Sequence, residues 1–460
     1  MSCDSKDWQD LELLSLHFCV RRLALSISSM RRCFAAVVLC ASTFCAGALR
    51  SSDGPAIENN AVMTDMIPRY YHSSAQILEY FHQLANGGCQ GGTSVVLDKH
   101  GDLPSITTAI FKRGTGVKKK VFFLFGEHAR ELISPETAMQ MAKDLCMLDP
   151  ATRSVAETVL SHSEVFMVPI ANPLGRLSVE KGNTCQRVNE NGVDLNRNWA
   201  SHWEEDEGSI GSDTYPGKSS FSEVETRTLK TMVEAYKPSM FVTVHSGTLG
   251  MYTPYAYSTD VPHDDPNDLN NMVRIIDKLN PTYCQCPSGP AGKEVGYLCP
   301  GTCLDFAYDE VKTKYSFAFE IFASDADSIH ETYRQSKKTA LLEVGRLRVH
   351  KPHVHEPHRH NSHEYSCFLQ TAVESSASLM NKLSPSECVG YFNPTTKEEY
   401  EQTKTKWAEA FLKMIDMAHG AQEAVGTSKA SLEQIVSPAK HAISSLLRAN
   451  ANNAPPRSRV

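Results

Sequence analysis

Four short apolar runs, widely spaced along the chain, constrain the fold more than any other feature of the sequence. They cover residues 121–125, 164–170, 240–245 and 315–321. Each run is almost continuously hydrophobic, which is typical of strands that are buried on both faces of a sheet. Helical patterns fill the intervals, for example over about 135–147. This alternation predicts an α/β fold, with one large domain built on a mixed, mostly parallel, twisted sheet that carries helices on both faces.

Further helices have their own sequence signals. Residues 266–279 and about 396–418 are amphipathic and are predicted to be helical. Another helix is predicted to start at Ser222, because Ser222 and Glu225 have the spacing of a capping box, in which each side chain binds the backbone N–H of the other.

The N-terminus carries a targeting signal. Two arginines follow Met30, an apolar stretch comes next, and small residues at 46–48 form a cleavage-site pattern. The apolar stretch is shorter than the roughly 20 residues that a membrane-spanning helix needs. We therefore predict a secretory signal peptide that starts at Met30, a secreted or luminal protein, and no stable membrane span after cleavage.

These features divide the chain into four parts. We expect an N-terminal extension with the signal peptide over 1–48, a linker over 49–69, the folded domain over 70–420 and a weakly structured or disordered tail over 421–460. Inside the domain, histidines and prolines crowd residues 350–363. We interpret this tract as a solvated insertion, with metal binding as the alternative.

The charge balance excludes one class of partner. The formal net charge is −7, and no basic stripe with interleaved aromatic residues occurs. Nucleic-acid-binding proteins usually carry a basic face, so no nucleic-acid partner is expected. We expect a monomer.

Cysteine use fits an oxidising compartment. Fourteen cysteines are present, and nine of them follow the predicted signal peptide. Four of the nine lie between Cys284 and Cys303, where local disulfides, a zinc knot and free thiols are the alternatives. Disulfides are favoured, because the Cys-x-Cys spacing suits zinc poorly. Since nine is odd, at least one thiol is free or pairs outside the chain.

Potential metal ligands stand where the apolar runs end. His128 and Glu131 follow the first run, and His245 ends the third. In open α/β sheets, ligands bind beyond the carboxyl ends of the strands. Two histidines and one glutamate leave a zinc ion one open position for water. The sequence therefore predicts one zinc ion per chain, held by His128, Glu131 and His245.

Groups suited to carboxylate recognition and proton transfer lie nearby in the pattern. Arg197 belongs to a polar segment after the second run, and the planar guanidinium of arginine binds both oxygens of a carboxylate. Glu320 lies in the fourth run between Phe319 and Ile321. Burial there would raise the pKa of its carboxyl group and suit it to proton transfer. The alternative is a structural, ion-paired glutamate.

Several separate motifs, in a consistent order, resemble the zinc carboxypeptidases of the carboxypeptidase A/B type. The motifs are Gly126–Glu131, Gly192–Trp199, Tyr215–Glu225, His245–Gly247, Gly296–Asp309 and Phe317–Glu320. The resemblance covers about residues 70–420 and is greater to the plant and protist branch than to the digestive enzymes. It implies a zinc-dependent exopeptidase that hydrolyses the C-terminal peptide bond of peptides and proteins.

The resemblance also implies roles in catalysis. His128, Glu131 and His245 match the family's zinc ligands. Glu320 matches its general base and acid, and Arg187 resembles the residue that stabilises the oxyanion.

Further positions match groups that bind the substrate. Asn196, Arg197 and Tyr297 match the residues that hold the terminal carboxylate. Arg130 resembles a residue that lines the neighbouring subsite. Asp194 resembles the carboxylate that orients a ligand histidine, a role with its own physical basis.

Leu304 matches the position that reads the terminal side chain of the substrate. An acidic residue there would suit Lys or Arg, whereas Leu304, with the uncharged Ala256 near another specificity position, favours a neutral or hydrophobic residue. Two alternatives stay open. One is a related zinc amidohydrolase that acts on small N-acyl amino acids or unusual amides, and the other is a non-catalytic binding homologue.

Overall fold

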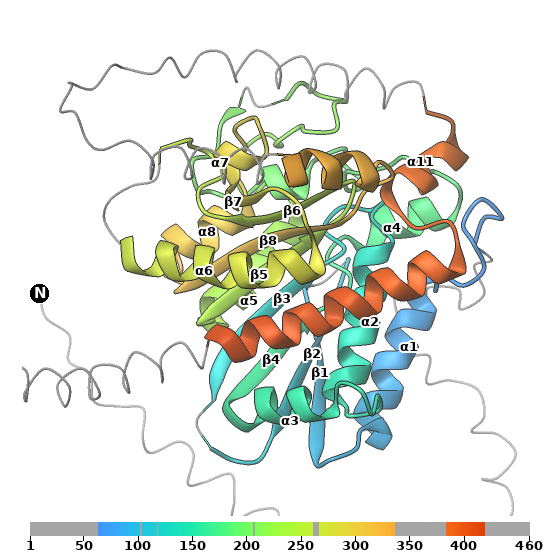
Figure 1. The fold of residues 1–460 in the computed structure, drawn as a ribbon. Coiled ribbons are helices and arrows are strands. Elements are labelled where there is room, and N and C mark those ends of the chain that lie inside the picture. The colour runs from blue at the N-terminus through green and yellow to red at the C-terminus, as the bar shows by residue number, and fades with distance from the viewer. Residues whose placement is uncertain are drawn as a thin grey trace, which may run out of the picture. The chain divides into compact units, whose positions relative to one another are not determined.

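A mixed eight-stranded sheet organises the part of the chain that the computed structural model describes (Figure 1). That part covers residues 63–335, without 102–103, 117, 206–207 and 261–265, together with residues 383–418. The chain divides into two units, Met1–Asn59 and Asn60–Val460, and every described residue lies in the second. The predictions for the signal peptide, the histidine-rich tract and the C-terminal tail therefore fall outside the described residues.

The strands lie in the order β1-β2-β4-β3-β5-β8-β6-β7 across the sheet. Their bounds are Thr93–His100 (β1), Ile106–Arg113 (β2), Lys119–Phe125 (β3), Ser163–Val168 (β4), Met240–His245 (β5), Thr248–Thr253 (β6), Ser288–Pro290 (β7) and Tyr315–Phe322 (β8). The central strands β4, β3, β5 and β8 are parallel, whereas β1, β2 and β6 join the sheet through antiparallel pairs. The predicted mixed, mostly parallel sheet is confirmed, and the four apolar runs form its centre.

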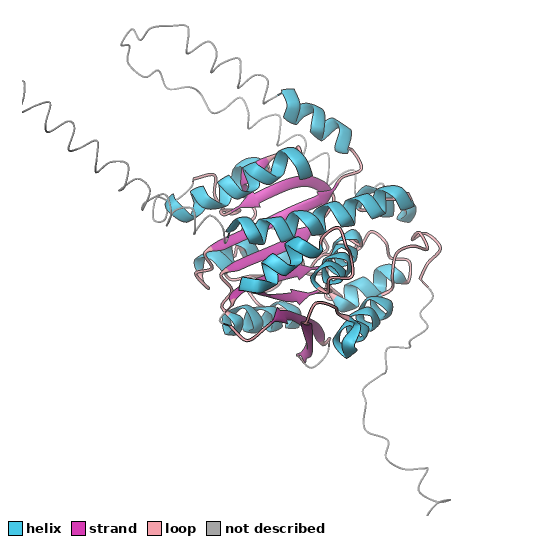
Figure 2. Cartoon of the chain, turned by 60° about the horizontal axis from the view of Figure 1, so that its bottom comes forward, coloured by secondary structure: helices cyan, strands magenta, loops and turns pink. Residues whose placement is uncertain are grey.

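Helices cover both faces of the sheet (Figure 2). Their bounds are Ser74–Gln83 (α1), Ile133–Leu145 (α2), Arg153–His162 (α3), Pro173–Glu180 (α4), Val224–Tyr236 (α5), Pro266–Tyr283 (α6), Ala291–Glu294 (α7), Cys303–Asp309 (α8) and Pro385–Phe392 (α11). Two further helical segments cover 326–335 and 397–418. Among the described residues, no helix combines the length and the apolar character that a membrane crossing requires.

Alternate residues of β3 enter two separate cores. Phe123 and Phe125 pack against Phe411 of the last described helix on one face. Phe122 lies on the other face and stacks on Phe241 of the neighbouring strand. Burying each of these rings contributes roughly 1.5–3 kcal/mol relative to leaving it exposed. The strand is therefore covered on both faces, as its continuous apolar sequence predicts.

The N-terminus of α5 differs from the prediction. The sequence predicts a capping box between Ser222 and Glu225, but the helix begins at Val224 with Glu223 as its N-cap and no side-chain cap. The Ser222 hydroxyl instead donates to Glu223 and accepts a hydrogen bond from Asn198 Nδ2. The prediction is wrong because a tertiary contact from the Asn198 loop engages the hydroxyl that would cap the helix.

Disulfide pairing is only partly local. The pairs are Cys89–Cys146, Cys185–Cys388 and Cys284–Cys286. Cys299 and Cys303 keep their thiols, and Cys367 lies outside the described residues. Within 284–303, the favoured local disulfide is therefore found for Cys284 and Cys286 but not for Cys299 and Cys303. Among the described residues, no cysteine belongs to a cluster that could hold a metal ion.

Candidate active site

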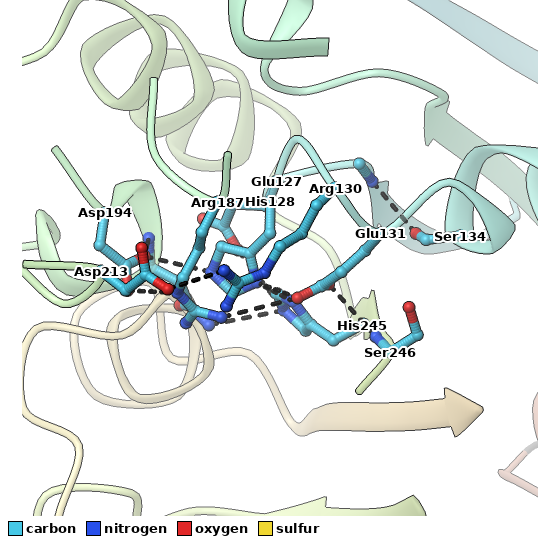
Figure 3. A network of polar contacts seen from close by, with 12 residues as sticks. Glu127, His128, Arg130, Glu131, Ser134, Arg187, Asp194, Asp213, His245 and Ser246 are labelled. Carbon is cyan, nitrogen blue, oxygen red and sulfur yellow. Dashed lines mark hydrogen bonds and ion pairs between the residues drawn. The ribbon is translucent and has the colours of Figure 1, made fainter. Parts of the chain in front are cut away.

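The candidate ligands meet at the carboxyl ends of the central strands (Figure 3). His128 and Glu131 follow β3 in a turn that opens at Gly126, whose φ of 66° lies in the left-handed region that favours glycine. His245 is the last residue of β5 and pairs in register with Glu320 on β8. Parallel strands end at the same edge of a sheet, so residues from distant parts of the chain come together there.

Three buried side chains form a compact cluster. His128 Nδ1 lies 2.7 Å from Glu131 Oε1, and His245 Nδ1 lies 3.2 Å from Glu131 Oε2. The two imidazole Nδ1 atoms are 3.0 Å apart. One ligand atom from each residue lies within 4.8 Å of the others.

The hydrogen-bond partners of the His128 ring indicate that this cluster fits a cation. His128 Nε2 lies 3.1 Å from Asp194 Oδ1, an acceptor, so Nε2 carries the hydrogen and Nδ1 presents a lone pair in the neutral ring. That lone pair faces a carboxylate oxygen of Glu131, a repulsive arrangement that a positive charge between them relieves. Two imidazole nitrogens with one carboxylate are a donor set typical of catalytic zinc. The residues therefore fit the predicted ion.

Glu131 and His245 change each other's pKa values. Burial alone would raise the pKa of Glu131, but His128 and His245 lower it below its ordinary value. Burial alone would lower the pKa of His245, but Glu131 raises it to about 9. Glu131 and His245 thus favour opposite charges on each other.

Asp194 fixes the far side of His128. Its Oδ2 accepts a hydrogen bond from Arg187 Nε at 3.0 Å, and its Oδ1 also accepts the backbone N–H of Asn196. Burial alone would raise the pKa of Asp194, but Arg187 and His128 hold it well below its usual range. Asp194 is therefore an ionised acceptor for the imidazole N–H.

Glu320 lies beside the cluster with one free acceptor. The residue is partly buried, and its Oε2 is buried without a hydrogen-bond partner among the described residues. Burial, with help from Glu131, raises the pKa of Glu320 to about 8, while His245 and Arg187 act in the opposite direction. The direction of the shift agrees with the prediction from its aromatic neighbours.

Cationic and amide side chains lie close to the candidate metal ligands. Arg187 reaches within 3.6 Å of Glu131. Asn196 Nδ2 lies 3.4 Å from His245 Nε2, and the Arg197 guanidinium, which is buried, donates to Asn196 O.

Two further predicted substrate-binding residues, Tyr297 and Arg130, differ in their exposure. Tyr297 is 41% exposed, so its ring is accessible from solvent. The Arg130 guanidinium is buried and donates to Asp213 and to Cys185 O, and it lies 4.0 Å from the Phe392 ring centroid. These contacts hold the Arg130 guanidinium in place.

Leu304 belongs to a small apolar cluster. The buried members are Tyr252, Ala256, Ala291, Cys299 and Leu304. Asp305, next to Leu304 on α8, accepts the backbone N–H groups of Ala256 and Tyr257 and so holds that loop against the helix.

Sequence reasoning missed two buried polar residues, Glu127 and Thr243. Thr243 Oγ1 lies 2.8 Å from His245 Nε2, and Glu127 Oε2 lies 3.6 Å from the same atom. Their positions gave a signal. Glu127 directly precedes the candidate ligand His128. Thr243 precedes His245 by two residues, so the side chains of Thr243 and His245 lie on the same face of β5.

Comparison with known proteins agrees with this geometry. Residues 103–340, just over half of the chain, match the family model described as zinc carboxypeptidase. Carboxypeptidase A2 of Mus musculus is 32% identical over 231 residues, which cover 46% of this chain and 53% of that protein. Carboxypeptidase B of Astacus astacus is 28% identical over 232 residues, which cover 47% of this chain and 75% of that protein.

A solved structure is also similar. Bovine thrombin-activatable fibrinolysis inhibitor, in complex with tick carboxypeptidase inhibitor, matches with a TM-score of 0.48 and 20% identity, and the match covers 76% of this chain and 98% of that one. The chain spans about half the length of the first curated relatives that it matches. The match to the family model, together with the cluster of His128, Glu131 and His245, shows that the chain belongs to the zinc carboxypeptidase family.

Proposed function

We propose that the protein is a zinc-dependent carboxypeptidase that removes the last residue from peptides and proteins. The observation that carries this proposal is the buried cluster of His128, Glu131 and His245, with Glu320 on the adjacent strand. The amino-acid types, their burial and the unpartnered oxygen of Glu320 all suit hydrolysis at a metal.

Glu320 moves the proton in this mechanism. A bound zinc ion would act as a Lewis acid and lower the pKa of a water molecule in the site. The Glu320 carboxylate accepts a proton from the water molecule that attacks the last peptide carbonyl, and it then delivers this proton to the leaving amine. A raised pKa suits both steps, because the group then takes up and releases a proton near neutral pH.

Arg187 stabilises the charge that develops on the carbonyl oxygen. It is partly buried and already oriented by Asp194, so it needs little rearrangement during the reaction. Donors of this kind commonly contribute on the order of 3 kcal/mol to the transition state.

Arg197 makes the enzyme an exopeptidase in this proposal. Together with Asn196 and Tyr297, it holds the free carboxylate at the end of the substrate. An internal peptide bond offers no such group, so a peptide that extends past this point leaves the guanidinium without its partner. Arg130 lines the adjoining subsite.

The apolar cluster around Leu304 favours a neutral or hydrophobic terminal residue. Placing a lysine or arginine charge among these apolar side chains is costly unless the charge is paired there. We expect kcat/KM to be higher for peptides that end in Phe than for matched peptides that end in Arg. A clear preference for Arg would contradict this assignment.

Other features are inferred from the sequence. We infer one zinc ion per chain, a secreted or luminal protein, a monomer, and greater similarity to the plant and protist branch of the family. The domain limits, with 1–48 as extension and signal peptide, 49–69 as linker, 70–420 as catalytic domain and 421–460 as tail, remain predictions too.

A paired assay tests the function. Purified protein should contain zinc and should hydrolyse peptides with free C-termini, and chelation should abolish the activity. Matched peptides with amidated C-termini should resist hydrolysis. Cleavage of N-acyl amino acids without peptide cleavage would favour the amidohydrolase. Zinc binding without any hydrolysis would favour a non-catalytic homologue.

A further inference from the structure

His245 has a polar support behind its ring that no known role explains. Its Nδ1 faces Glu131 and His128, whereas its Nε2 lies 2.8 Å from Thr243 Oγ1. Behind that hydroxyl lies the carboxylate of Glu127, with Oε2 3.5 Å from Thr243 Oγ1.

The direction of these hydrogen bonds follows from the ligand role of the ring. A metal-binding Nδ1 must present a lone pair, so Nε2 carries the ring hydrogen and donates it to Thr243 Oγ1. The hydroxyl hydrogen of Thr243 is then free to point at Glu127 Oε2, which can only accept when ionised. Thr243 thus links the imidazole N–H to a buried carboxylate.

Glu127 is held firmly enough to serve as this acceptor. It is 1% exposed, its Oε1 accepts Trp199 Nε1–H at 3.1 Å, and Cys303 Sγ lies 3.5 Å from its Oε2. Burial raises the pKa of the Cys303 thiol well above its ordinary value, so the thiol keeps its hydrogen and can donate. A buried carboxylate is tolerated only with such donors around it.

The two ligand histidines therefore have different supports. The N–H of His128 meets a carboxylate directly, at 3.1 Å from Asp194. The N–H of His245 reaches its carboxylate through a hydroxyl. Partners of this kind orient metal-binding imidazoles and raise their basicity.

We propose that Thr243 and Glu127 are positioning residues that hold His245 in the tautomer and orientation required for metal binding. The proposal rests on the metal site of the proposed function. It assigns the two residues no contact with the substrate.

Zinc affinity of the full chain, measured by competition with a chromogenic chelator, tests this role. Thr243→Val keeps the side-chain shape but removes the hydroxyl, and Glu127→Gln replaces the acceptor by an amide. Each should weaken zinc binding about 10–100-fold. Thr243→Ser restores the hydroxyl and should bind zinc nearly as tightly as the parent.

Two controls separate positioning from general loss of structure. Thr137→Val removes another buried hydroxyl, whose one hydrogen-bond partner among the described residues is Ile133 O within its own helix, and should leave zinc affinity unchanged. The visible spectrum of the cobalt(II)-substituted protein should shift in Thr243→Val but not in Thr137→Val, because only the former alters ligand geometry.

The outcomes are distinct. Parental zinc affinity and cobalt spectra in Thr243→Val would overturn the inference while leaving the proposed function intact. A parent that binds no zinc would overturn both. If Glu127→Gln fails to fold, the comparison of Thr243→Val with Thr243→Ser decides alone, because valine and serine test the hydroxyl in one backbone position.

Discussion

The amino edge and the carboxyl edge of the central sheet both carry charged side chains, but these side chains have different kinds of partner. At the amino edge, a cavity of about 270 Å³ is lined in part by Lys118, Lys119, Lys120, Lys237 and Lys314. Lys118 donates to Leu160 O and Ser161 O at the end of α3, and Lys120 donates to Tyr236 O at the end of α5. At the carboxyl edge, charged side chains face one another.

This difference in partners indicates that the charges at the amino edge stabilise the structure, whereas those at the carboxyl edge serve the chemistry of the site. Helices end with unsatisfied carbonyls and a partial negative charge, which lysine side chains neutralise. At the amino edge, Lys118 and Lys120 thus donate hydrogen bonds to backbone carbonyls that the helices leave unsatisfied. At the carboxyl edge, Glu320 keeps a buried oxygen with no partner among the described residues, and lone pairs of His128 and His245 converge. We therefore do not assign the reactive site to the lysine-lined cavity.

The largest effect is expected from Glu320→Gln. The variant should keep its zinc, because Glu320 is not a ligand, yet lose turnover about 10²–10⁴-fold for want of a proton acceptor. Steady-state kinetics and metal analysis on the same sample measure both. Near-parental turnover would remove Glu320 from the mechanism.

The pH dependence of stability in the metal-free protein should also depend on Glu320. Its pKa is raised from 4.5 to about 8 in the folded state, so the folded chain binds more protons than the unfolded chain between these values. Stability must then fall as pH rises through this range. His245, with its pKa raised to about 9, adds to that fall, and it adds less in Glu320→Gln because the Glu320 charge helps to raise the pKa of His245.

Urea unfolding at pH 5.5 and at pH 8.5 isolates the contribution of Glu320. Without metal, Glu320→Gln should be more stable than the parent at the higher pH, by up to about 5 kcal/mol, and should gain far less at the lower pH. Equal pH dependence in both proteins would show that burial does not disfavour the charged carboxylate.

Arg197→Ala should have an intermediate effect. Losing a charge-assisted bond to the terminal carboxylate should lower kcat/KM for free peptides by about 10–100-fold, mainly through KM. Amidated peptides should remain poor substrates. The thermal unfolding temperature provides the control, since Arg197 is buried. An unchanged KM would argue against carboxylate binding at this residue.

The smallest effect is expected at the amino edge. Lys118→Met keeps the aliphatic stem but loses the bonds to the α3 carbonyls, so the free energy of unfolding should fall by about 0.5–1.5 kcal/mol. Values of kcat and KM should match the parent. A loss of activity without a loss of stability would contradict the purely structural role that we assign to the lysines of the amino edge.

The sequence predicts the centre of this molecule better than its margins. The four central strands are buried on both faces, so their apolar runs are plain. By contrast, β1 is an edge strand with alternating burial, and β7 has three residues, so these strands carry weak sequence signals. The metal cluster was predictable because its residue types and strand-end positions are both diagnostic.

The role of Glu127 could not be predicted in the same way. Its partners Trp199 and Cys303 lie 72 and 176 residues away, and only the fold brings them together. The same holds for Ser222, whose capping role is lost to Asn198 of a distant loop. Local patterns specify elements and ligands, while hydrogen-bond partners across the core depend on tertiary structure.

Diffraction at the zinc absorption edge, from crystals of the full chain, tests the central claim most directly. The account predicts one anomalous peak about 2.0–2.2 Å from His128 Nδ1, His245 Nδ1 and an oxygen of Glu131. A structure of zinc-loaded protein without a peak at this position, or with its zinc held by other residues, would contradict it.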